Sequence, residues 1–337
     1  MADPPATVHG VEHLRVVSPP LADDELARGS DLARALIDAL AASVRAPREA
    51  LASAVACLLA GGHLLIEDVP GVGKTVLAKS LARAAGCGFS RLQCTADLLP
   101  SDVTGVHIYD QRSQTFEFRP GPVFANVLLA DEINRASPKT QSALLESMEE
   151  AQVTVDGHTR QLPRPFMVVA TMNPVEYEGT FALPEAQLDR FALRLTIGYP
   201  PVEQEARMII DLAVHDPVDD VSPVADDARI RDAIAAAGRI HVDPSIARYV
   251  VDLVTATRED RRLVLGASPR AGLTLLRIAK AVALIEGQGY VVPEHVKAMA
   301  GPVLAHRLML GPEARVGGIT GEDIVTAALG AVRAPAI

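Results

Sequence analysis

The chain has 337 residues, enough to bury a large core and, by length, to form two domains. Its net charge of −10 argues against a broad electrostatic footprint, so stable nucleic acid or membrane binding is not expected. Three cysteines without Cys-x-x-Cys spacing, no apolar run of membrane-spanning length and no signal-peptide pattern predict a cytoplasmic protein in a reducing compartment.

The first part of the chain predicts an arm followed by an α/β domain. Residues 1–30 hold four prolines and an acidic run at residues 23–25, which favour a flexible arm. Helical periodicity follows over Asp31–Val44 and Pro47–Ala60. Five strand-like runs come next, several of them separated by helical segments: His63–Ile66, Phe89–Gln93, Val127–Ala130, Phe166–Thr171 and Leu193–Ile197. This alternation predicts a doubly wound parallel sheet over residues 31–200.

The remainder of the chain, residues 201–337, predicts a helical domain. After Pro201 the strand-like runs cease, and apolar residues recur at three- and four-residue spacing. The segment His215–Asp227, rich in Asp and Pro, is expected to be a solvated linker. The expected helices are Val202–Val214, Ala228–Ala237, Ser245–Thr257, Pro269–Glu286, Pro293–Leu310 and a short one at Glu322–Val332.

A glycine-rich segment between the first strand and the following helix predicts a phosphate-binding loop. Its N–H groups and the positive helix end can hold phosphates, while Lys74 reaches the β/γ oxygens and Thr75 holds Mg²⁺. Asp68 stands where the generic pattern has its first glycine, but Gly71 and Gly73, which crowd the phosphates most, are present. The predicted ATP-binding residues are Val69, Pro70, Gly71, Val72, Gly73, Lys74, Thr75 and Val76.

Two acids end the buried run Val127–Ala130. Asp131 and Glu132 therefore emerge at the carboxyl end of a predicted parallel strand, where open α/β sheets bind ligands. Asp131 would order Mg²⁺, and Glu132 would act as the base or polarising group that hydrolysis requires. The alternative is that the two acids only cap the next turn.

Two hairpin patterns interrupt the α/β domain. Ile108-Tyr109 and Thr115–Phe118 flank a polar turn, and two short strand-like runs at residues 153–155 and 158–160 flank Asp156-Gly157. Phosphate-loop enzymes in general require neither hairpin. Decoration at a sheet edge is the alternative to a functional role.

Four segments carry a resemblance to the MoxR-type AAA+ ATPases: Val69–Thr75, Leu129–Ala136, Lys139–Glu146 and Leu183–Phe191. The resemblance spans about residues 31–310. It implies an α/β P-loop core with a five-stranded parallel sheet, β-hairpin insertions and a C-terminal helical lid. It also implies a homo-oligomeric ring, usually a hexamer, with ATP at the subunit interfaces. The two hairpins resemble the family's insertion in its second helix and the hairpin before sensor 1.

The same resemblance gives roles to four polar residues. Asn173 resembles sensor 1, which orients the attacking water, with an Asn-Pro turn as the alternative. Arg190 resembles the arginine finger that reaches a neighbour's γ-phosphate. Arg270 resembles sensor 2, which makes it a ninth predicted nucleotide-binding residue, and its place at a helix start calls for a compensating anion. Arg135 acts across the interface or is an ordinary surface charge.

These patterns together predict a Mg²⁺-dependent ATPase ring that remodels or matures protein complexes. The resemblance implies protein clients, a partner with a von Willebrand A-type domain and, in some members, metal or cofactor insertion. No Asn-Lys-x-Asp guanine motif is present, although Ala46-Pro47 replaces the family's Gly-Gln near the adenine. The alternatives are a chelatase-like subunit, a DNA-acting helicase-type motor, which the acidic charge disfavours, and a nucleotide-gated scaffold with little turnover. Glu132, Asn173 and Arg190 together argue against the scaffold.

Overall fold

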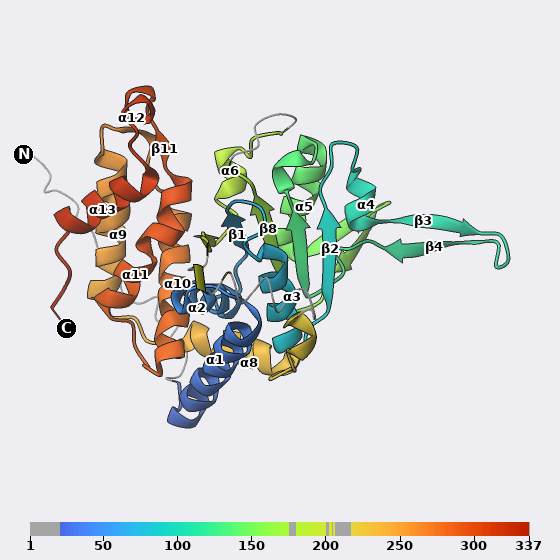
Figure 1. Cartoon of the computed structure of the whole chain (residues 1–337), viewed down its shortest axis with the longest axis horizontal. Coiled ribbons are helices and arrows are strands. Elements are labelled where there is room, and N and C mark those ends of the chain that lie inside the picture. Colours follow the sequence, from blue (N-terminus) through green and yellow to red (C-terminus); the bar gives the residue numbers. More distant parts are fainter. Residues whose placement is uncertain (1–20, 175–179, 200–201, 204, 206–216, 337) are drawn as a thin grey trace, which may run out of the picture.

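The computed structural model describes residues 21–174, 180–199, 202–203, 205 and 217–336. Figure 1 shows an α/β core with helices of the C-terminal region on one side and a long β-hairpin projecting from the other. The predicted combination of a sheet domain, hairpin insertions and a helical C-terminal region is therefore confirmed.

The core is built on one five-stranded sheet in the order β2-β5-β8-β1-β9, and every neighbouring pair is parallel. The predicted parallel sheet is confirmed, with small changes at its ends. The last strand ends at Leu195 rather than Ile197, and the fourth begins at Met167 rather than Phe166. The strands are β1 (Leu64–Glu67), β2 (Phe89–Gln93), β5 (Val127–Asp131), β8 (Met167–Met172) and β9 (Leu193–Leu195).

Both faces of this sheet are buried, because successive side chains of a strand point to opposite faces. On β1, Leu64 and Ile66 belong to one hydrophobic cluster and Leu65 to a second. The first cluster includes residues of α1, α2 and α3, and the second includes residues of α5. The bounds of these helices are α1 (Asp23–Ser43), α2 (Arg48–Leu59), α3 (Lys74–Ala84) and α5 (Pro138–Glu150).

Helix α1 corrects the expected flexible arm. It begins at Asp23 instead of Asp31, and Gly29 and Ser30 are already buried. The acidic run at residues 23–25 forms its first turn, where negative charge interacts favourably with the helix dipole. A run interpreted as part of an arm is thus a helix start. The rest of the predicted arm, residues 1–20, lies outside the described residues.

Both predicted hairpins are present. Strands β3 (Gly105–Asp110) and β4 (Thr115–Pro120) form one, after the short helix α4 (Pro100–Thr104), and β6 (Gln152–Val155) and β7 (His158–Gln161) form the other. The two hairpins contact each other. The Nδ1 atom of His107 lies 2.6 Å from the Asp156 carboxylate, and the Arg160 guanidinium lies 3.9 Å from the centre of the Phe118 ring.

The C-terminal helices lie close to their predicted bounds, but two predictions for this region were wrong. The predicted solvated linker contains the 3-10 turn η2 (Pro217–Asp220), in which Val218 is buried. The single helix expected over Pro293–Leu310 ends at Leu304, and a 3-10 turn (η3, Ala305–Arg307) and a short strand follow it. Pro302 lies near its end and lacks the backbone N–H that a helix uses. The other elements are η2 (Pro217–Asp220), α8 (Asp227–Arg239), α9 (Pro244–Glu259), β10 (Leu263–Leu265), α10 (Pro269–Glu286), α11 (Pro293–Leu304), β11 (Met309–Leu310), α12 (Pro312–Val316) and α13 (Gly321–Ala331).

Some predictions fall on residues that the structure does not describe. Most of the expected helix Val202–Val214, the domain boundary at residues 200–201 and the start of the predicted linker are among them. In the described part of the chain, none of the helices is both long and apolar enough to span a membrane.

Lowering the pH from 7 to 5 is expected to destabilise the fold through His63. This buried ring donates from Nε2 to the Met148 carbonyl (3.0 Å) and accepts at Nδ1 from the Val168 N–H (2.9 Å). Burial lowers the pKa of His63 from 6.5 to about 4. Between these values the unfolded state binds the extra proton, so the free energy of unfolding falls as pH falls, by at most about 1.4 kcal/mol per pH unit.

Denaturant titrations of the wild type and of His63→Asn between pH 7 and pH 5 check this expectation. Asparagine does not titrate, so the variant should lose stability less steeply. Burial also lowers the pKa of His306, which contributes equally to both proteins. Equal slopes in the two titrations would contradict the role given to His63.

Candidate active site

The glycine-rich loop forms a cradle at the carboxyl end of β1. Gly71 and Gly73 have φ angles of 85° and 91°, a left-handed conformation that favours glycine, and Gly73 is the N-cap of α3. A Cβ atom built on either glycine would meet no atom within 4 Å. The loop therefore borders open space beside a helix N-terminus. It gathers the predicted residues Val69, Pro70, Gly71, Val72 and Gly73, and Lys74, Thr75 and Val76 lie in the first turn of α3.

Asp68, the mismatch to the generic loop pattern, has a structural role. Its side chain is buried and accepts hydrogen bonds from the backbone N–H groups of Ile197 and Gly198, both at 2.7 Å. It also accepts one from the N–H of Val69 at 2.8 Å. A glycine could make none of these side-chain contacts. Asp68 thus ties the phosphate-binding loop to the segment that follows β9.

Lys74 lies where β1 and β8 meet. Its ammonium group donates to the carbonyl oxygens of Asp68 at 2.6 Å and Met172 at 3.3 Å. These contacts hold the cation at the base of the cradle, where a phosphate would lie against it.

Asp131 is the last residue of β5 and is largely buried. Its Oδ1 accepts a hydrogen bond from the Thr171 hydroxyl at 2.7 Å, and its Oδ2 pairs with the Arg91 guanidinium at 2.6 Å. With the Thr75 hydroxyl, this carboxylate offers hard oxygen donors of the kind that Mg²⁺ prefers. The donor set at the cradle therefore fits the predicted ion.

Glu132 has a backbone conformation that is unusual for a residue other than glycine. Its φ and ψ angles are 56° and 52°, and such conformations concentrate at functional sites. The backbone N–H donates to the Thr171 hydroxyl at 2.8 Å. One carboxylate oxygen accepts from Gln93 at 3.1 Å and from Arg135 at 3.0 Å. Arg135, for which the sequence left two roles open, thus pairs with Glu132 of its own chain.

The order of the strands also places Asn173, the predicted sensor 1 residue, at the edge of the sheet that carries the loop and the two acids. Asn173 directly follows β8 and is buried. Strand β8 lies between β5, which carries Asp131, and β1, which leads into the loop. The carboxyl ends of parallel strands lie at one edge, so Asn173 lies between the acids and Lys74.

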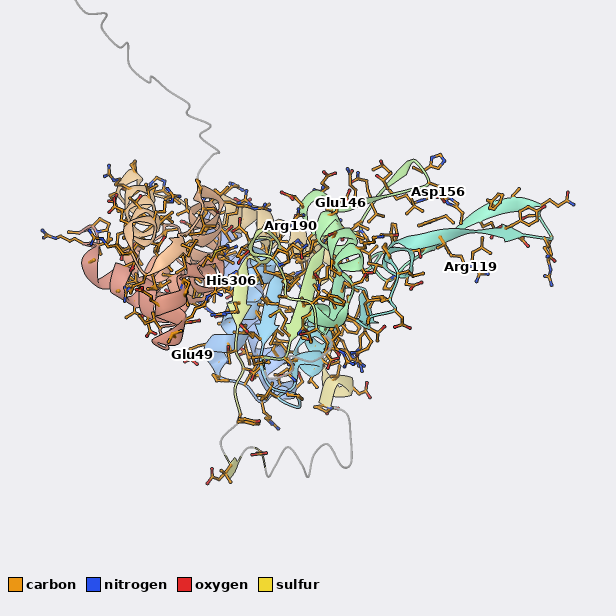
Figure 2. The ribbon with its side chains drawn as sticks, turned by 90° about the horizontal axis from the view of Figure 1, so that it is seen from above. Glu49, Arg119, Glu146, Asp156, Arg190 and His306 are labelled. Atoms are coloured by element: carbon orange, nitrogen blue, oxygen red, sulfur yellow. The ribbon has the colours of Figure 1, made fainter. Side chains whose placement is uncertain are left out.

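Arg190 and Arg270 lie at the opposite end of the sheet. Arg190 precedes β9, after the short helix α6 (Glu185–Leu188), and Arg270 is the second residue of α10. A cavity of about 470 Å³ is lined by both arginines and by Gly62 and His63, which precede β1. In Figure 2 Arg190 lies on the same side of the core as Glu146, a residue of the last turns of α5.

The distance between the two ends is set by the strands. Strand β1 has four residues at roughly 3.3 Å each, so about 13 Å of extended backbone separates the residues that precede it from the loop that follows it. Helix α5 starts shortly after Asp131 and runs back along the sheet to Glu149. The Glu149 carboxylate pairs with Arg190 at 3.0 Å and with Arg270 at 3.1 Å. Glu149 is therefore the compensating anion that was expected for Arg270 at its helix start.

A buried arginine of the C-terminal region holds the turn that carries Arg190. The Arg307 side chain is almost fully buried and its Nε donates to the Asp189 carboxylate at 2.7 Å. Its Nη2 donates to the Phe191 carbonyl at 2.6 Å. Pairing and hydrogen bonding offset the cost of burying this charge. The C-terminal helices thereby fix the residues on either side of Arg190.

The sequence interpretation missed several residues of this site: Arg91, Gln93, Thr171, Glu149 and Arg307. A signal existed for two of them. Arg91 and Gln93 alternate along the predicted strand Phe89–Gln93, which places both on one face, and their strand pairs with β5. Glu149 had no such signal, because its partner Arg270 is 121 residues away.

Comparisons with known proteins agree with this geometry. Residues 63–193 match the family described as "ATPase family associated with various cellular activities (AAA)", and residues 255–328 match the AAA lid domain. The chain is 50% identical over 281 residues to the uncharacterized protein YeaC of Bacillus subtilis, covering 83% of this chain and 88% of that protein. It is 42% identical over 290 residues to chaperone MoxR1 of Mycobacterium tuberculosis, covering 83% and 76%.

A solved structure shows the same architecture. The crystal structure of a protein from Cytophaga hutchinsonii superposes with a TM-score of 0.87 at 36% identity. The match covers 93% of this chain and 98% of that one, so it includes the core and the C-terminal helices together.

Proposed function

The chain belongs to the MoxR-type AAA+ ATPases, as its motifs predicted, and on this premise we propose that it hydrolyses Mg²⁺-bound ATP at sites shared by two subunits of a ring. Family membership carries nucleotide binding, ATP hydrolysis, oligomeric assembly and a chaperone-like role. The proposal adds a six-subunit ring that remodels or matures protein complexes together with a von Willebrand A-type partner. Metal or cofactor insertion and a cytoplasmic location stay predictions.

The observation that carries the proposal is the separation of the site into two halves. Lys74, Asp131, Glu132 and Asn173 lie at one edge of the sheet, and the two arginines lie at the other. One chain therefore does not present both halves to the same nucleotide. In a closed ring with head-to-tail contacts, one face of each subunit meets the other face of its neighbour.

This geometry supports a role for Arg270 that the sequence did not specify. The sequence grouped it with the residues that bind nucleotide, but within one chain it is far from the cradle. We assign it, with Arg190, to the nucleotide of the neighbouring subunit. Two guanidinium groups at that position would stabilise the charge that develops on the transferred phosphoryl group.

The remaining residues have distinct tasks in hydrolysis. Loop N–H groups and Lys74 hold the phosphates, and Glu132 polarises the attacking water. Asn173 orients that water through a neutral amide, which leaves the charge of Glu132 intact. Thr75 and Asp131 would hold Mg²⁺, which neutralises charge on the β- and γ-phosphate oxygens when bound.

The dependence of activity on chain concentration tests the shared site. The ATPase rate per chain is expected to rise with concentration and to level off where light scattering shows complete rings, because an isolated chain lacks the arginine half of its own site. A monomer that hydrolyses ATP at the plateau rate would contradict the proposal.

Two additions to this experiment address the biological role. DNA at physiological salt should neither bind tightly nor stimulate hydrolysis; tight binding with stimulation would favour the helicase-type motor. Purification under conditions that trap ATP would identify the client and show whether a von Willebrand A-type protein accompanies the ring.

A further inference from the structure

One carboxylate joins the two arginines of the proposed interface. Glu149 lies at the end of α5, and each of its oxygens serves a different guanidinium group: Oε2 pairs with Arg190 and Oε1 with Arg270. Arg190 also donates to the Leu145 carbonyl of the same helix at 2.5 Å. The end of α5 is thus the common support of an arginine from the core and an arginine from α10.

Electrostatics explains why such a support is needed. Two guanidinium groups that both approach one phosphate must lie close to each other, and like charges at short range repel. Before a phosphate arrives, nothing in the arginines themselves keeps them together. A shared carboxylate offsets the repulsion and holds both side chains, so their orientation is set in advance of binding.

We propose that Glu149 is a positioning residue that holds Arg190 and Arg270 together, ready for the γ-phosphate of the neighbouring subunit. The inference rests on the proposed function, in which both arginines act across the interface. Glu149 itself acts through the arginines, and its own contacts are made at the far end of the sheet from the cradle of its chain.

The exposure of Glu149 makes the inference testable without unfolding the protein. Its side chain is 44% exposed, and exposed ion pairs contribute little to stability. Glu150, the next residue, is a matched control. It is an exposed glutamate at the same helix end, and its carboxylate accepts a hydrogen bond from Gln152.

The test compares Glu149→Gln with Glu150→Gln in assembled rings. Glutamine keeps the size of the side chain but lacks the charge that draws two cations together. The kcat of Glu149→Gln should fall about tenfold, less than the 10³–10⁵-fold loss typical of removing a finger. Its ATP dissociation constant, measured with a fluorescent analogue, should stay unchanged. Glu150→Gln should match the wild type in both.

Mixed rings separate positioning from a general structural defect. In a mixture of Glu149→Gln and Glu132→Gln chains, some interfaces combine intact arginines from the second chain with the intact Glu132 of the first. The rate should then rise several-fold above the average of the separate rings. If the rate does not rise, the defect of Glu149→Gln lies within its own site, which would overturn the inference.

Parallel measurements on Arg190→Ala and Arg270→Ala show which idea has failed. If both are impaired while Glu149→Gln keeps the wild-type kcat, the positioning role of Glu149 is wrong and the shared site stands. If all three variants keep the wild-type kcat, the arginines do not act at the interface and the proposed function itself is wrong.

Discussion

Glu132→Gln is expected to lower the rate of ATP hydrolysis by about 10²–10⁴-fold, the range typical of losing a general base, while ATP affinity and ring assembly persist. The substituted amide has the same size, and its oxygen can still accept hydrogen bonds from Gln93 and Arg135, which contact Glu132 in the structure. It cannot polarise water as a carboxylate does. Steady-state turnover and equilibrium nucleotide binding, measured on the same preparation, separate the two effects.

Lys74→Ala is the control that affects binding instead of chemistry. In the wild type, the Lys74 ammonium group is held against the backbone at the base of the cradle, where it would contact phosphate oxygens. The variant should therefore bind ATP more weakly than Glu132→Gln does. Unchanged turnover of Glu132→Gln would exclude it as the base, and wild-type ATP affinity of Lys74→Ala would show that the loop is not the phosphate site.

The half of the site around the cradle was predictable because contiguous residues encode it. A glycine loop between a strand and a helix, and two acids after an apolar strand, each determine their own local geometry. Asn173 needed only the position of a strand end. These patterns did not predict the hydrogen bonds that support the site. The Asp68 carboxylate accepts from the N–H groups of Ile197 and Gly198, which are far from it in the sequence. The Thr171 hydroxyl donates to Asp131 and accepts from the Glu132 N–H.

For the arginine half of the site, the sequence identified the two arginines but not the contacts that hold them in place. The resemblance identified Arg190 and Arg270, yet their common partner Glu149 and the buried Arg307 depend on packing between distant segments. Boundary errors had local causes. The acidic run at residues 23–25 fits a solvated arm and a helix start equally well, and only the burial of Gly29 and Ser30 decides between them.

Mixing two inactive variants is expected to restore ATP hydrolysis if each site is built from two chains. Arg190→Ala chains keep Lys74, Asp131 and Glu132, whereas Glu132→Gln chains keep their arginines. Alone, Arg190→Ala should lose about 10³–10⁵-fold in turnover, as typical for a finger supplied by a neighbour. In equal random mixtures, about one quarter of the interfaces pair a good finger with a good Glu132, and these should regain transition-state stabilisation.

A second mixture provides the control. Arg190→Ala and Arg270→Ala both damage the half that a chain donates, so every interface in their mixture still receives one defective pair of arginines. This mixture should show no such gain, although its rings exchange subunits equally well. Subunit exchange is checked by energy transfer between labelled chains. No gain in the first mixture, or an equal gain in the control mixture, would contradict the trans assignment. Near wild-type turnover by Arg190→Ala alone would show that hydrolysis does not need this arginine as a finger.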